Sequence, residues 1–86
     1  MIEVNFTSSF VRDFDHLEND LADEVVEKIE LFKDRKNHKL LKVHKLHGPL
    51  SGKWSFSVNY KARIVFEYDS KDEVALLKIG DHDVYR

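Results

Sequence analysis

The sequence predicts one small α+β domain spanning residues 1–86, with the element order β-α-α-β-β-β. Two N-terminal helices are expected to pack on one face of a curved antiparallel sheet. Three observations predict this class: strand-like alternation at the N-terminus, two stretches with apolar residues at helical spacing, and three strand-like stretches in the C-terminal half. A chain of 86 residues forms only one hydrophobic core, so no second domain is expected.

The first third of the chain contains the predicted N-terminal strand and both helices. Apolar and polar residues alternate over 2–6, which indicates a short strand with one buried face. Hydroxyl side chains at 7–9 can cap a first helix, whose apolar residues recur at helical spacing up to Leu17. Asn19–Asp20 can cap a second helix, whose apolar stripe continues to Phe32.

The rest of the chain is predicted to form most of the sheet. Periodicity is weak over 36–46, where a structured loop is expected, and residues 47–52 form a turn that contains proline and glycine. Alternating apolar and polar residues over 54–60 and 63–68 predict a hairpin with a tight reversal. The nearly continuous apolar run 74–79 predicts a central strand covered on both faces.

The composition excludes several classes of protein. The absence of cysteine excludes disulfides, thiolate zinc sites and cysteine nucleophiles, and the three glycines cannot form a dinucleotide- or NTP-binding loop. No metal or other cofactor is expected, because His38, His44 and His47 lack the spacing and the nearby acids of a ligand set. The longest apolar run is far shorter than a membrane helix, so we expect a cytoplasmic protein without a membrane partner.

Charge is distributed unevenly along the chain. The formal net charge is −2, but residues 1–35 carry −6 and residues 36–86 carry +4. The stretch 36–63 contains seven Lys and Arg residues, three of the five histidines and no acid. Such a stretch can bind a polyanion, and this asymmetry suggests contact with nucleic acid.

One polar face of the predicted hairpin is a candidate site for a phosphodiester backbone. Strand alternation and the flanking residues assign to it Lys53, Ser55, Ser57, Asn59, Lys61 and Arg63. Lys and Arg bind phosphate, and an Asn side chain can read a base edge. For any one of these residues the alternative is a solvated polar face without a ligand.

A histidine follows the last predicted strand. His82 lies between Asp81 and Asp83, just past the strand end, where a scaffold can display catalytic groups. Because an imidazole titrates near neutral pH, His82 can act as a general acid or base. The alternative is a surface histidine with a structural or incidental role.

Three motifs in order give the chain a family likeness. The residues GPLSGKW over 48–54, ARIVF over 62–66 and IGDHDVY over 79–85 resemble motifs of the RelE/ParE superfamily of bacterial toxins, particularly the RelE, YoeB and YafQ branches. The likeness extends to the N-terminal strand and helices, so it spans the whole chain. It implies the same strand, helix pair and curved sheet that the periodicity predicts.

The resemblance also implies a function. Most RNase members of this superfamily are toxins of type II toxin–antitoxin systems that bind the ribosome and cleave mRNA without a metal. The 2′-hydroxyl of the RNA attacks the adjacent phosphate. The resemblance implies that Arg63 stabilises this phosphate, that His82 is the general acid or base, and that Tyr85 stacks on or orients the substrate.

The remaining residues of the expected site bind RNA. His47, Lys53 and Lys61 lie where other members carry basic or imidazole groups, and Asn59 joins them from the polar face of the hairpin. The implied partners are a cognate antitoxin protein, the ribosome and mRNA. DNA is expected to be contacted only through the antitoxin.

The sequence departs from the family pattern at two serines. Many members are strongly basic and carry a second arginine on the strand after the turn, where this chain has Ser55 and Ser57. The alternative function is therefore a member of the same fold that is not a nuclease, either a ParE-like gyrase inhibitor or a decayed toxin in a repressor complex. His82 with Tyr85 favours the nuclease, because the ParE branch lacks this ending.

Overall fold

The computed structural model describes residues 1–81 and confirms the α+β class. Its strands are β1 (Glu3–Phe6), β2 (His44–Lys45), β3 (Trp54–Ser57), β4 (Arg63–Ser70) and β5 (Glu73–Gly80). Its helices are α1 (Ser8–Asp15) and α2 (Asn19–Phe32), with two short 3-10 turns, η1 (Arg35–Asn37) and η2 (Gly48–Leu50). No helix of the described residues is long and apolar enough to cross a membrane.

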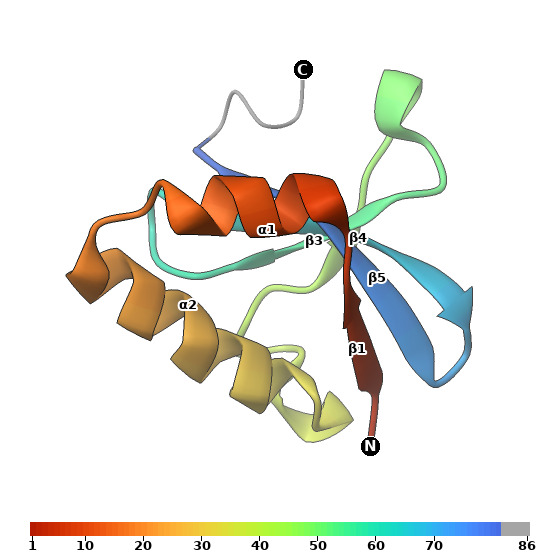
Figure 1. The fold of residues 1–86 in the computed structure, drawn as a ribbon. Helices are drawn as coiled ribbons and strands as arrows, with labels where there is room; N and C mark the ends of the chain where they lie inside the picture. Colours follow the sequence, from red (N-terminus) through yellow and green to blue (C-terminus); the bar gives the residue numbers. More distant parts are fainter. Residues whose placement is uncertain (82–86) are drawn as a thin grey trace.

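The five strands form one sheet in the order β1-β5-β4-β3-β2 (Figure 1). The sheet is mostly antiparallel, as predicted, but β1 pairs with β5 in parallel at one edge. A parallel pair needs a long connection, and here that connection contains both helices and the three other strands. The first strand therefore lies beside the last one, with α1 following directly from it.

The two helices begin in different ways. Thr7 caps α1 as predicted: its Oγ1 accepts from the Phe10 backbone N–H at 3.2 Å and donates to the Leu76 carbonyl oxygen at 2.8 Å. The predicted cap of α2 is wrong, because Asn19 is its first helical residue and Glu18 precedes it without a side-chain cap bond. The cap of α1 also ties that helix to β5.

The core lies between the helices and one face of the sheet. Phe32, at the end of α2, is fully buried, and its ring stacks on Phe56 of β3 with 4.4 Å between centroids. Its ring also meets Phe66 of β4 at 4.8 Å and 66°. His38 stacks on Phe32 at 4.7 Å and bonds its carbonyl oxygen through Nε2 at 2.8 Å. One aromatic side chain thus joins α2 to two strands and to the segment that follows the helix.

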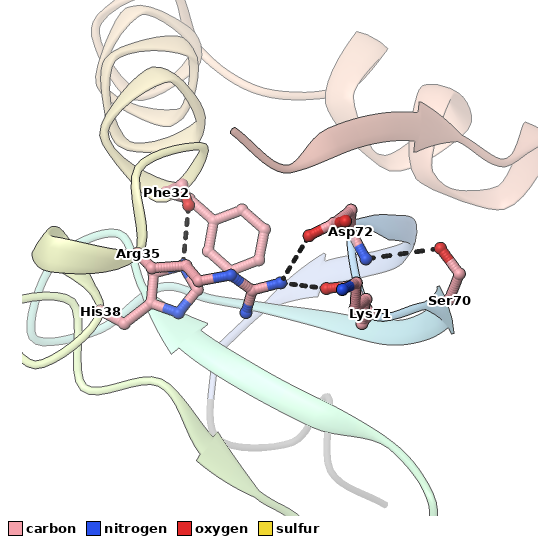
Figure 2. A network of polar contacts seen from close by, with 6 residues as sticks. All are labelled: Phe32, Arg35, His38, Ser70, Lys71 and Asp72. Atoms are coloured by element: carbon pink, nitrogen blue, oxygen red, sulfur yellow. Dashed lines mark hydrogen bonds and ion pairs between the residues drawn. The ribbon is translucent and has the colours of Figure 1, made fainter.

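The region predicted as a structured loop contains η1 and β2. The Lys36 backbone N–H bonds Asp34 Oδ1 at 3.1 Å, which begins η1 and lowers the pKa of the Asp34 carboxyl. Figure 2 shows Arg35 reaching from η1 to the β4–β5 turn, where it donates to the Lys71 carbonyl oxygen and to Asp72 Oδ1, the latter at 3.3 Å. These contacts fix the start of the basic stretch against the sheet.

The predicted strand over 54–60 is shorter in the structure and ends at Ser57. The Val58 N–H donates to the Ala62 carbonyl oxygen at 2.9 Å, so the chain already turns back there. The Ser57 N–H bonds the Leu41 carbonyl oxygen at 2.8 Å, which attaches the 40–42 segment beside the end of β3. The predicted reversal is confirmed.

Candidate nucleic-acid interface

Cross-strand pairing identifies the side chains on the sheet face opposite the core. Ser55 is the register partner of Val65, Val65 is opposite Lys78, and Ser57 is opposite Arg63. Ser55 is 0% exposed and Val65 3%. The prediction of a solvent-facing Ser55 is therefore wrong, because this residue lies in the middle of the sheet, between β2 and β4. The accessible polar groups lie nearer the ends of the strands.

Arg63 begins β4 at the β3–β4 reversal. Its Nη1 donates to the Asn59 carbonyl oxygen at 2.6 Å and to the Ala62 carbonyl oxygen at 3.2 Å. These bonds hold the guanidinium against the turn. Within residues 1–81, no hydrogen bond or ion pair uses its Nε or Nη2. An arginine has five N–H donors, so three of them can still bind a ligand.

Asn59 shapes the same reversal. Its Oδ1 accepts from the backbone N–H groups of Lys61 at 2.8 Å and Ala62 at 2.7 Å. Its Nδ2 donates to Glu24 Oε1 on α2 at 2.6 Å. An Asn side chain that bonds the backbone two residues on stabilises a turn. Asn59 was predicted to contact RNA, and the structure places it where it orders the turn that carries Arg63 and joins that turn to α2.

A cavity of about 470 Å³ lies beside the reversal. Its walls come from α2, from residues 40–42 and from the reversal, and they include Lys28, Lys42, Asn59, Tyr60 and Arg63. Tyr60 is 80% exposed, and Lys61 Nζ lies 5.7 Å from the centre of its ring. Glu27 also lines the cavity, where it pairs with Lys28 at 3.4 Å. The wall thus combines cations with one exposed aromatic ring.

His47 and Lys53 lie at the other end of β3. Both glycines of the turn between them have positive φ, 67° at Gly48 and 92° at Gly52, as the predicted turn requires. Lys53 Nζ pairs with Glu67 on β4 at 3.4 Å, and His47 is exposed. The predicted RNA-binding residues therefore form two groups. They are separated by the four residues of β3, a length of about 14 Å at about 3.4 Å per residue.

Both groups belong to the acid-free stretch 36–63. Lys36 pairs with Asp34 at 3.5 Å and Lys53 pairs with Glu67. The other four lysines enter no ion pair with any residue of the part that the structure describes; they are Lys39, Lys42, Lys45 and Lys61. Lys45 Nζ lies 5.9 Å from the Trp54 ring centre, in cation–π geometry. Uncompensated positive charge of this kind attracts polyanions.

The two other predicted catalytic residues, His82 and Tyr85, lie outside the described residues. β5 ends at Gly80, which is the register partner of Arg63. The described chain therefore ends beside Arg63. Among residues 1–81, no group of three or more His, Asp or Glu side chains is arranged to hold a metal ion.

Solved structures provide the comparison with known proteins. The chain superposes on one chain of a toxin–antitoxin complex, RelBE2 from Mycobacterium tuberculosis, with TM-score 0.75 and 24% identity. The match covers 94% of this protein and 98% of the RelBE2 chain. The chain has the RelE-like toxin fold. The YoeB-YefM complex from Staphylococcus aureus matches with TM-score 0.73 and 17% identity, over 95% and 98% of the two chains. A mutant of YafQ from E. coli matches with TM-score 0.71 and 12% identity, over 98% and 97%. No protein-family model and no curated protein matches the sequence.

Sequence reasoning missed part of the RelE-like domain's basic cavity. Lys28, on an otherwise acidic helix, and Leu40 and Tyr60, two exposed apolar side chains, line it together. Lys42 adopts φ 57°, the left-handed region that is uncommon for a non-glycine residue. The absence of acids over 36–63 indicated the charge of this region. The pairing of segment 40–42 with β3 had no signal in the periodicity.

Proposed function

We propose that this protein is the toxin of a type II toxin–antitoxin system and an endoribonuclease that cleaves mRNA on the ribosome. The RelE-like fold supports the toxin class. The observation that carries the nuclease is Arg63, a cation held in place by the backbone of a turn. No residue of 1–81 uses its donors on Nε and Nη2, which can bind a phosphate. A cation that is positioned before the reaction stabilises the charge that develops on the phosphate.

The proposed reaction needs no metal. The RNA 2′-oxygen forms a bond to the adjacent phosphorus, and the bond from phosphorus to the 5′-oxygen breaks. A base removes the proton of the 2′-hydroxyl, and an acid donates a proton to the leaving 5′-oxygen. The products are a cyclic phosphate on one fragment and a 5′-hydroxyl on the other. Arg63 stabilises the pentacovalent phosphorane, His82 acts as general acid or base, and Tyr85 stacks on or orients the substrate.

The proposed RNA contacts extend from Arg63 to the other end of β3. Lys61 lies next to the cavity and binds phosphate, while His47 and Lys53 bind the RNA about one strand length away. Asn59, which the sequence assigns to RNA binding, contributes by ordering the turn beneath Arg63. An extended RNA strand lying along β3 can reach both groups.

The proposed partners are a cognate antitoxin and the ribosome, in the cytoplasm. Structural neighbours were crystallised with antitoxins, as in the YoeB-YefM complex and the archaeal RelE-RelB complex from Pyrococcus horikoshii. In the proposed system, any contact with DNA is made through the antitoxin.

Controlled expression in bacteria, followed by mapping of mRNA 5′ ends, tests the nuclease. The wild type is expected to arrest growth and to produce new mRNA ends within translated regions. Arg63→Ala and His82→Ala are each expected to reduce cleavage by about 10²- to 10³-fold, the usual cost of removing a group that stabilises or protonates the transition state. Arg12→Ala, which removes an exposed arginine of α1, is the matched control and should cleave like the wild type.

Two outcomes would overturn parts of this proposal. Growth arrest without new mRNA ends contradicts the nuclease, and a gyrase supercoiling assay then tests the ParE-like alternative. Full cleavage by His82→Ala contradicts the role of His82 while leaving the nuclease intact. An inert wild type in both assays supports the decayed toxin.

A further inference from the structure

The helical side of the molecule contains an apolar groove that no basic residue within 1–81 lines. It has a volume of about 270 Å³ and is lined by Phe6 of β1, by Phe10, Val11 and Phe14 of α1, and by Val26 and Ile29 of α2. Figure 1 shows β1, α1 and α2 on the same side of the molecule. The groove therefore lies where the edge strand and the two helices meet.

Three of its side chains are unusually exposed for their size. Phe6 is 55% exposed, Val26 50% and Val11 45%. The floor is ordered by aromatic contacts, with ring centroids 5.6 Å apart for Phe6 and Phe10 and 6.4 Å apart for Phe10 and Phe14. Scattered apolar residues on a surface are ordinary, but a contiguous group around a preformed groove marks a site of association.

Acidic residues lie at and near this groove. Glu30 lines it, Asp23 lies one turn before Val26 on α2, and Asp15 follows Val11 by one turn on α1. Glu30 pairs with Lys33 at 2.7 Å, whereas Asp15 and Asp23 enter no ion pair within residues 1–81. Residues 8–32 contain eight acids and only two bases. The helical layer around the groove therefore carries a net negative charge.

We propose that this groove binds a segment of a partner protein that combines apolar side chains with lysine or arginine beside them. The apolar side chains bury Phe6, Val11 and Val26, and the cations approach the acidic residues of the helical layer. An amphipathic helix fits these requirements, because it places apolar and basic residues on adjacent faces. Charge complementarity of this kind selects the partner and speeds association.

The negative charge of the helical layer argues against the other occupants. A second copy of the same chain, in a two-fold interface, would bring two acidic helical layers together, and like charges facing each other are repulsive. RNA and anionic lipid surfaces are both repelled by the acids. Identifying the partner as the antitoxin rests on the proposed function, whereas the chemistry of the segment rests on the groove alone.

Selection from a random peptide library tests the proposal with a defined probe. Random 16-residue peptides displayed on phage are selected on the immobilised full-length protein at low salt, and the enriched sequences are read. We expect enrichment of apolar residues with Lys or Arg and depletion of Asp and Glu. A synthetic peptide of the most enriched sequence is then titrated against the protein by fluorescence anisotropy.

Two matched variants locate the binding site. Val26→Asp adds a charge to the groove. It is expected to lower the affinity for the peptide at least about tenfold, as truncation at a binding hot spot does. Leu40→Asp makes the same kind of change at a side chain that is 71% exposed and outside the groove, and it should bind the peptide like the wild type. Asp23→Asn should weaken binding at low salt and have little effect at high salt. Urea denaturation of each variant shows whether it is folded.

The outcomes decide between the possible occupants. Enriched peptides without an excess of basic residues, or peptides that bind Val26→Asp as tightly as the wild type, overturn the proposal. If the wild type sediments as a dimer and Val26→Asp sediments as a monomer, a second copy of the chain occupies the groove, and the proposal is overturned as well. Cleavage by Val26→Asp should equal that of the wild type. If the nuclease fails but the peptide still requires Val26, only the proposed function has failed.

Discussion

The helical layer, residues 8–32, and the basic stretch, residues 36–63, adjoin in the chain but differ in almost every surface property. The helical layer has a net charge of −6, whereas the basic stretch has seven Lys and Arg residues and no acid. The hollow on the first is lined almost entirely by apolar side chains, and that on the second combines lysines, Arg63 and a tyrosine. A small domain thus presents two chemically opposite surfaces, suited to a protein partner and to a polyanion.

Where these two regions meet, buried contacts join them. Phe32 ends α2 and packs on Phe56 and Phe66 of the sheet. At the other end of the sheet, Glu24 of α2 receives a hydrogen bond from Asn59 in the β3–β4 reversal. The basic surface therefore depends on the helical layer for its position, although the two surfaces are proposed to bind different partners.

Of the substitutions considered, replacing Phe32 should weaken the packing between the helical layer and the sheet most strongly. Phe32→Ala removes a fully buried ring and leaves a cavity, so it should lower the free energy of unfolding by about 3–5 kcal/mol, measured by urea denaturation. Leu40→Ala, at a side chain that is 71% exposed, is the control and should change this free energy by no more than about 0.5 kcal/mol. A loss below about 1 kcal/mol for Phe32→Ala would contradict the packing described for this ring.

Replacing Asn59 should loosen the basic surface from the helical layer. Asn59→Ala removes two bonds to backbone N–H groups and one to Glu24, so we expect a loss of about 1–3 kcal/mol of stability. Because the same turn holds Arg63, cleavage should also fall under conditions in which the variant is fully folded. Glu24→Gln keeps an acceptor for Asn59 and should retain most of both properties. Unchanged cleavage by folded Asn59→Ala would show that the turn does not position Arg63.

Charge variants on the two regions should respond differently to salt. Each phosphate contact with single-stranded nucleic acid contributes about 0.7 to the slope of log affinity against log salt concentration. Lys61→Gln should reduce that slope by about this amount for binding of single-stranded RNA. Asp23→Asn, at an exposed residue of α2 that does not line the cavity, should leave it unchanged within error. Equal slopes for Lys61→Gln and the wild type would remove Lys61 from the proposed RNA contacts.

Breaking the contact between η1 and the β4–β5 turn should have the smallest effect on stability. Arg35 and Asp72 are about half exposed, and their ion pair is 3.3 Å long. Such pairs contribute about 0.2–1 kcal/mol, so Arg35→Ala should lower stability only slightly and the difference should shrink at high salt. Thermal unfolding at low and high salt measures it. A loss above about 2 kcal/mol would mean that this side chain has a larger role than its exposure indicates.

The sequence predicts the elements better than it predicts their accessibility. Hydrophobic periodicity is a local property, so it located both helices, the reversal and the strong β5 strand. It misplaced the start of α2, because Asn is a preferred cap residue, yet here Asn19 is already helical and Glu18 precedes it without a side-chain cap bond. It could not show that Ser55 is buried, because alternation assigns a face to a residue without revealing how far into the sheet that residue lies.

The candidate site was predicted in charge and in residue types, but its shape was not. The acid-free stretch identified the lysines, and the family likeness identified Arg63. The cavity beside Arg63 depends on α2, on segment 40–42 and on the reversal, which are distant in sequence and meet only in the fold. The apolar groove had no separate signal, because Val11 and Val26 look like any other member of an amphipathic stripe.

The proposed function requires RNA to bind on the basic surface beside Arg63 and not at the apolar groove of the helical layer. Backbone amide NMR of the ¹⁵N-labelled protein, titrated with a short 2′-O-methyl RNA that cannot undergo 2′-hydroxyl attack, tests this requirement directly. The largest chemical-shift changes are expected at Lys42, Tyr60, Lys61 and Arg63, with negligible changes over residues 8–15 of α1, none of which lines the cavity beside Arg63. Changes centred on 8–15, or no changes near Arg63 at saturating RNA, would contradict this site.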